Sequence, residues 1–120
     1  MKKQTEALLN QIIESIQDKK GKGITVVDLT DIQDTITDYF VICQANTPNQ
    51  ISSIAQEVRD EVKHNTGESP LSIDGQRNAE WVAIDYANVV VHIFLPETRD
   101  FYSLETLWAD AHLKTIPDIE

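Results

Sequence analysis

The feature that most constrains this fold is a run of apolar residues at helical spacing directly after Thr47 and Pro48. A threonine followed by proline is a typical helix start, because the hydroxyl can cap a free amide and proline suits the first turn. The apolar positions then recur at offsets of three, four, seven and eleven, at Ile51, Ile54, Ala55, Val58 and Val62. The spacing predicts an amphipathic helix that ends near residues 65–67 and packs on another layer.

The rest of the chain alternates between helical and β-prone patterns. Residues 2–20 place apolar side chains at helical spacing, and a last helix is expected to share Phe101, Leu104, Leu107, Trp108 and Ala111 on one face. The expected strands are 24–27, 39–43, 71–74, 81–86 and 89–94. The order predicts an α/β fold with a mixed β-sheet flanked by helices, in a single domain over 1–120. Residues after about 114 are expected to fray, because Pro117 blocks further helix.

Two of the strands should form a hairpin. Residues 81–86 and 89–94 are separated only by Ala87 and Asn88. The usual glycine is missing, so we expect Asn88 to adopt the left-handed conformation that the turn needs.

The chain is strongly acidic. It has 20 acidic and 10 basic side chains, a formal net charge of −10. A phosphate backbone would be repelled, so no direct nucleic-acid recognition is expected. The same charge would attract a basic protein surface, or it could serve only to keep the protein soluble, and composition leaves both interpretations open.

The single cysteine and the N-terminal sequence indicate a cytoplasmic protein. Cys43 follows Phe40, Val41 and Ile42, which predicts a buried thiol and excludes disulfide stapling. The N-terminus lacks the continuous apolar stretch of a signal peptide or a membrane span, so no membrane partner is expected.

No catalytic motif is recognisable. The four glycines, at 21, 23, 67 and 75, do not match a phosphate-binding loop, a nucleophile elbow or a dinucleotide fingerprint. His64, His92 and His112 lie too far apart in sequence to suggest a shared metal, and His92 lies within a strand, which favours a structural role. Aspartates near strand ends, Asp28, Asp38, Asp74 and Asp85, could hold Mg²⁺, but without a D-x-D pair capping and turn roles are favoured. We expect no catalytic residue, no metal and no cofactor.

Aromatic residues are concentrated in the last third of the chain, among charged residues. They are Trp81, Tyr86, Phe101, Tyr102 and Trp108. Large amphipathic rings among charges can anchor an interface or form a core. We favour the core for Phe101 and Leu104, and both interpretations stay open for Trp81, Tyr102 and Trp108.

Three stretches, ITDYFVIC at 36–43, IDGQRNAEWVAIDYANVVVHIF at 73–94 and RDFYSLETLW at 99–108, together resemble the RsfS/Iojap family of ribosomal silencing factors along nearly the whole chain. The resemblance implies a domain prone to form a homodimer, related in fold to nucleotidyltransferases but without their activity. It also implies binding to ribosomal protein L-fourteen on the large ribosomal subunit, which would block subunit joining and lower translation when nutrients are short. A large-subunit assembly factor and a divergent nucleotidyltransferase are the alternative functions.

The resemblance also suggests which residues contact the partner. The positions that match the family and are expected to bind the partner are Asp74, Trp81, Asp85, Tyr86, His92, Tyr102, Glu105 and Trp108. The chain departs from the pattern at Gln44 and Ala45 after the second strand, and at Ala87 and Asn88 in the hairpin turn. These departures leave the turn geometry, and any contact made there, open.

Overall fold

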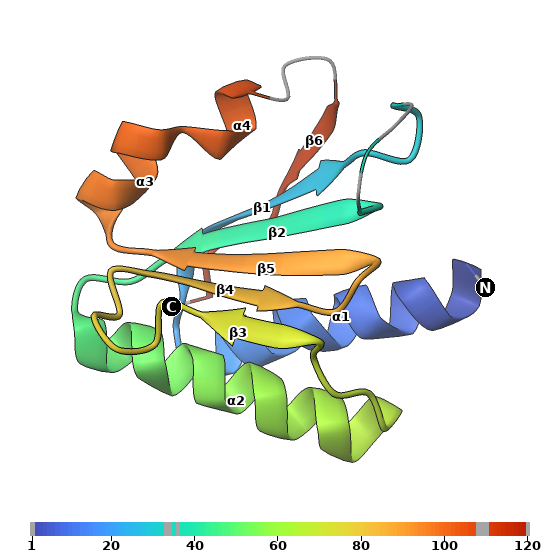
Figure 1. Ribbon diagram of the computed structural model, residues 1–120, viewed down its shortest axis with the longest axis horizontal. Helices are drawn as coiled ribbons and strands as arrows, with labels where there is room; N and C mark the ends of the chain where they lie inside the picture. The colour runs from blue at the N-terminus through green and yellow to red at the C-terminus, as the bar shows by residue number, and fades with distance from the viewer. Residues whose placement is uncertain (1, 33–34, 36, 108–110, 120) are drawn as a thin grey trace.

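A mixed six-stranded sheet forms the centre of the computed structural model, which describes residues 2–32, 35, 37–107 and 111–119 (Figure 1). The sheet order is β3-β4-β5-β2-β1-β6. The strands are β1 (Lys22–Asp28), β2 (Tyr39–Gln44), β3 (Ser72–Asp74), β4 (Trp81–Asp85), β5 (Val89–Phe94) and β6 (His112–Thr115). Only β2 and β5 pair in parallel, and the other neighbours are antiparallel. The predicted α/β class and mixed sheet are confirmed.

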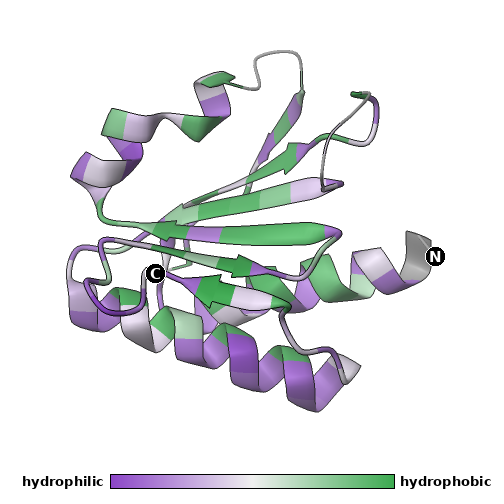
Figure 2. Ribbon diagram, viewed as in Figure 1, coloured by the Kyte–Doolittle hydropathy of each residue, from purple (hydrophilic) through white to green (hydrophobic). Residues whose placement is uncertain are grey.

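The helices α1 (Lys2–Asp18) and α2 (Pro48–Thr66) lie on one face of this sheet (Figure 1). The helix predicted after Thr47 is confirmed: the Gln50 amide donates to the Thr47 hydroxyl at 3.1 Å, and Gly67 ends the helix at a φ of 79°. Its five predicted apolar residues are all buried against the sheet, and hydrophilic residues follow its outer side (Figure 2). The main core therefore lies between these two helices and the sheet.

The opposite face of the sheet is covered by two short helices, α3 (Pro96–Tyr102) and α4 (Leu104–Leu107). A second, smaller cluster of buried residues lies there, made by Val27, Leu29, Ile42 and Phe94. Neither α3 nor α4 contains a fully buried residue. This layer is thus much thinner than the one on the other face.

The C-terminal region differs from the sequence prediction in two ways. The expected helix through Phe101 and Ala111 is interrupted, because Ser103 adopts a left-handed φ of 49° and ends α3; residues 108–110 lie outside the described part. The tail does not fray after residue 114: β6 pairs with β1, and the Ile116 amide donates to the Ile24 carbonyl. The physical reason is that β1 would otherwise present an unpaired strand edge.

The predicted β4–β5 hairpin is confirmed, but its turn is made differently. Ala87, not Asn88, adopts a positive φ, of 75°. The Asn88 amide donates to the Tyr86 carbonyl at 3.0 Å, and the Ala87 amide donates to an Asp85 carboxylate oxygen at 2.7 Å. The tight turn therefore places its left-handed residue one position earlier than expected.

Candidate functional site

A pocket of about 380 Å³ lies where α3 approaches the start of β4. Three aromatic rings line it, those of Trp81, Phe101 and Tyr102, together with the acidic residues Glu80 and Glu97. We call these five residues the aromatic pocket. Both glutamates are exposed, so two carboxylates lie beside the rings at the surface.

The rings of the aromatic pocket are in contact with one another. The Trp81 ring stacks on Phe94 with centroids 5.0 Å apart, and its centroid lies 4.6 Å from that of Tyr102. Tyr102 in turn meets Phe101 edge-on at 5.0 Å. The set runs from the buried Phe94 through half-buried Trp81 to Phe101, which is 80% exposed. Such a continuous, partly exposed aromatic surface is typical of a binding interface.

His92 holds the Trp81 ring in place through a hydrogen bond. The Trp81 Nε1–H donates to His92 Nδ1 at 3.0 Å, and the Phe40 ring lies edge-on to the imidazole at 5.0 Å. Burial lowers the pKa of His92 to about 4, although the Asp85 carboxylate acts in the opposite direction. A neutral imidazole is required here, since the Nδ1 lone pair must accept the indole proton. The bond to Trp81 supports the structural role expected for His92, and at 7% exposure the imidazole has little surface with which to contact a partner.

Tyr86, another expected contact residue, is buried. Its side chain is 5% exposed and packs in the core beneath the helices. Burial raises the pKa of its phenol to about 12, with Arg59 lowering it and Glu68 raising it. A partner contact through Tyr86 stays a prediction, and the ring offers little surface for it because it belongs to the face that α1 and α2 cover.

The acidic candidates fall at different places. Asp74 is exposed at the end of β3, directly before Gly75, which lines the pocket. Asp85 is at the opposite end of β4 from Trp81, about 13 Å away for a strand of that length, and it serves the hairpin turn. Glu105 is an ion-pair partner of Arg99 at 3.3 Å. Of these three, Asp74 is the one that lies beside the aromatic pocket, and within the described residues its carboxylate takes part in no turn or ion pair.

Several site residues escaped the sequence analysis. The prediction that Phe101 lies in the core is wrong, because its side chain is 80% exposed. Leu104, also expected in the core, is half-buried against the second cluster. Glu80 and Glu97 line the pocket but were not among the expected site residues. Glu80 directly precedes the strand expected at 81–86, and Glu97 lies four residues before Phe101. Trp108, a further candidate, lies outside the described residues.

Among the described residues, no group of three or more histidine, cysteine or acidic side chains could hold a metal ion. The carboxylate of Asp28 accepts from the Thr30 amide and hydroxyl, at 2.9 and 2.6 Å, in a turn role. Cys43 is fully buried, and burial raises the pKa of its thiol to about 12. Every helix among the described residues is too short or too polar to span a bilayer.

Comparison with known proteins gives consistent matches. The family model described as "Ribosomal silencing factor during starvation" matches residues 2–120. The ribosomal silencing factor RsfS of Bacillus subtilis is 35% identical over 108 residues, which cover 90% of each chain. A mouse protein named "Mitochondrial assembly of ribosomal large subunit protein 1" is 26% identical over 102 residues, covering 83% of this chain and 44% of that one. A crystal structure of a Chromobacterium violaceum protein superposes with a TM-score of 0.81 at 30% identity, covering 87% of this chain and 85% of the other.

Proposed function

The chain belongs to the RsfS/Iojap family of ribosomal silencing factors, and on that premise we propose that it binds ribosomal protein L-fourteen and obstructs subunit joining. Family membership itself makes the chain a non-enzymatic ribosomal silencing factor that acts on the large subunit. The identity of the contacted ribosomal protein and the steric mode of action are the proposal. Because the family is non-enzymatic, the divergent nucleotidyltransferase considered from the sequence is not retained.

The observation that supports this proposal is the aromatic pocket. A basic ribosomal surface has lysine and arginine side chains, and a cation over an aromatic face is attracted by the ring. Glu80 and Glu97 would add charge complementarity at the rim, and the net charge of −10 would speed the encounter. Trp81 and Tyr102 supply the large, partly buried rings that dominate many interfaces.

The proposed mechanism needs no bond to be made or broken. A folded domain bound to the subunit-facing side of the large subunit occupies the space that the small subunit requires. The sheet and the two long helices provide that bulk, and α3 with β4 provides the contact. Silencing then depends on occupancy, so it should scale with affinity and with protein concentration.

Binding can be tested by co-sedimentation with purified large subunits and by titration of isolated L-fourteen at two salt concentrations. We expect the double change Glu80→Gln and Glu97→Gln to weaken binding and flatten its salt dependence. The matched control is Glu14→Gln with Glu57→Gln, which removes the same charge from an exposed position on α1 and a half-buried position on α2. Equal loss of affinity in the two double variants would mean that net charge, not the aromatic pocket, directs binding. Absence of L-fourteen binding by the unchanged protein would refute the proposed partner.

A second candidate, assembly of the large subunit, is favoured by the name of the mouse relative. The two functions differ in the particle that is bound. A silencing factor should co-sediment with mature large subunits, whereas an assembly factor should prefer precursor particles. Pull-down from growing and starved cells, with the ribosomal RNA of each particle sized, separates them.

Two further properties are proposed with the function. We expect the protein to act in the cytoplasm, where ribosomal subunits join. Self-association into a homodimer is also expected. Phe101 and Leu107 are 80% and 71% exposed, and a dimer interface would remove these apolar side chains from water. Sedimentation equilibrium of the purified protein measures this directly, and a monomer at every concentration would exclude it.

A further inference from the structure

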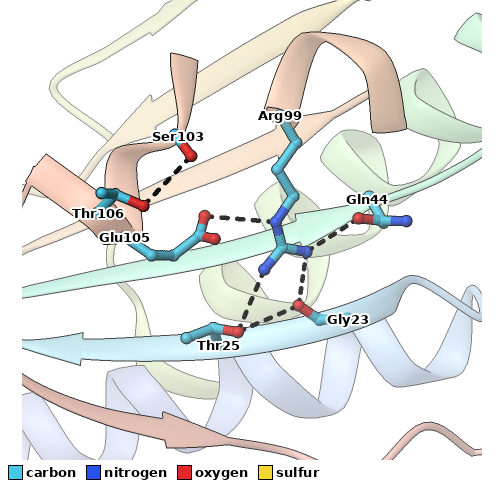
Figure 3. Close-up of polar contacts among 7 residues, drawn as sticks. All are labelled: Gly23, Thr25, Gln44, Arg99, Ser103, Glu105 and Thr106. Carbon is cyan, nitrogen blue, oxygen red and sulfur yellow. Dashed lines mark hydrogen bonds and ion pairs between the residues drawn. The ribbon is translucent and has the colours of Figure 1, made fainter. Parts of the chain in front are cut away.

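Arg99 is held by acceptors from three separate elements (Figure 3). Its Nη1 donates to the Gly23 carbonyl at 2.7 Å and to the Gln44 side-chain oxygen at 3.1 Å. Its Nη2 donates to the Thr25 hydroxyl at 3.2 Å, and its Nε to a Glu105 carboxylate oxygen at 3.3 Å. The side chain is only 11% exposed. A guanidinium satisfied in this way joins α3 to β1, β2 and α4.

The acceptor on β1 is built by an irregularity in the strand. The pairing of β1 with β2 shifts register between Lys22 and Thr25, and Gly23 adopts a left-handed φ of 59°. A Cβ atom at Gly23 would lie 2.6 Å from Arg99 Nη1, so a larger residue there would displace the guanidinium from this position. The Gly23 amide meanwhile donates to an Asp118 carboxylate oxygen at 2.9 Å. The irregular part of β1 thus directs the Gly23 carbonyl to Arg99, and the C-terminal segment accepts from the Gly23 amide.

Within the described residues, the segment that Arg99 fastens has few other contacts to hold it. We call residues 96–107, which form α3 and α4, the docked arm. Its helices have seven and four residues, far below the length at which an isolated helix is stable in water. Neither contains a buried residue, and its apolar contacts come from half-buried Leu104 and from the Tyr102 ring on Trp81. The position of the arm therefore depends strongly on its polar anchor.

The docked arm forms one wall of the aromatic pocket. Glu97, Phe101 and Tyr102 on the arm line the pocket, whereas the Arg99 side chain between them reaches the sheet. Successive helix residues differ in direction by about 100°, so one short helix can direct one side chain to the sheet and its neighbours to the pocket. Release of Arg99 would leave the β4 side of the pocket in place and remove the α3 side.

We propose that Arg99 is a positioning residue that keeps the docked arm on the sheet and so preforms the aromatic pocket for its basic partner. The role in binding rests on the proposed function, while the role in holding the arm stands without it. Apparent affinity falls in proportion to the fraction of molecules with a formed pocket. We expect Arg99→Gln to weaken binding at least tenfold, which corresponds to about 1.4 kcal/mol.

Amide hydrogen exchange of the full chain measures the arm directly. The amides of Ser103 and Leu107 donate to the carbonyls of Arg99 and Ser103 and report on the arm, whereas the Ala45 amide, bonded to the Phe94 carbonyl, reports on the sheet. Arg99→Gln should accelerate exchange in the arm and leave the sheet protected. Arg99→Lys should restore little, because one ammonium cannot reproduce the fork that reaches all of these acceptors.

The controls separate positioning from general charge or stability effects. Arg59→Gln removes the same charge from α2, on the other face of the sheet, and should leave both arm exchange and binding unchanged. If Arg99→Gln does not fold, Thr25→Val removes a single acceptor and should still accelerate exchange in the arm, to a smaller degree. Normal arm protection in either folded variant would overturn the proposal, as would a released arm with undiminished binding to L-fourteen. If the unchanged protein does not bind L-fourteen, the proposed function fails, and arm exchange alone still decides whether Arg99 holds the arm.

Discussion

The replacement His92→Asn should change how the stability of the protein depends on pH. In the folded protein, burial lowers the pKa of His92 from 6.5 to about 4. Each pKa unit corresponds to about 1.4 kcal/mol, so the full difference is worth roughly 3 kcal/mol. His92 is 7% exposed and receives the Trp81 indole proton on Nδ1, so protonation would both charge a buried ring and remove that acceptor.

The sign of the effect follows from the direction of the pKa change. Below pH 6.5 the unfolded chain takes up a proton on His92, whereas the folded protein does so only near pH 4. The contribution to stability is therefore complete above pH 6.5 and is lost as the pH falls toward 4. Between pH 7 and pH 5 the loss amounts to about 2 kcal/mol.

Urea denaturation at pH 7 and at pH 5 measures this contribution. Asparagine can still accept from Trp81 Nε1 but does not titrate, so the wild-type protein should lose about 2 kcal/mol more than His92→Asn between the two pH values. Contributions that the two proteins share do not enter the difference between them. His112→Asn, at an exposed histidine, should behave like the wild type. Parallel losses in wild type and His92→Asn would refute the account of a neutral, buried imidazole.

Three further outcomes are expected. Ala87→Gly should raise the unfolding free energy by up to about 1 kcal/mol, because it replaces an alanine that has a left-handed backbone. Ala83→Gly within β4 should lower the unfolding free energy. Thermal unfolding compares the two variants, and destabilisation by both would contradict the turn geometry. Phe101→Ala should weaken large-subunit binding about tenfold in the co-sedimentation assay and change the stability by no more than about 0.5 kcal/mol. Leu71 is similarly exposed, and Leu71→Ala should bind normally in the same assay. Gly75→Ala should destabilise the protein by more than about 2 kcal/mol in urea, since its Cβ would clash with the Trp81 carbonyl oxygen and the residue has a φ of 88°. A neutral effect would contradict this packing.

Local signals in the sequence were sufficient for the main architecture. The α2 helix is specified by a capping threonine, a first-turn proline, apolar periodicity and a terminal glycine, all within 21 consecutive residues from Thr47 to Gly67. The hairpin of β4 and β5 is likewise encoded by two β-prone runs with a two-residue gap. Elements whose determinants lie close together in sequence can be identified without the tertiary structure.

The errors concern residues whose environment is set from a distance. β6 has no apolar alternation that stands out, and it is a strand because the edge of β1 lies beside it. Phe101 shares helical spacing with Leu104, but the left-handed Ser103 breaks that face and leaves the ring in solvent. The importance of Arg99 depends on the carbonyl of Gly23, 76 positions earlier, which no local pattern indicates.

Joining of purified ribosomal subunits, followed by light scattering or sucrose-gradient sedimentation, tests the central claim most directly. Large subunits saturated with this protein should fail to join small subunits, and the inhibition should weaken in Phe101→Ala in proportion to its loss of affinity. If small subunits join saturated large subunits as readily as free ones, the protein does not act as a steric obstacle, and the proposed mechanism is wrong.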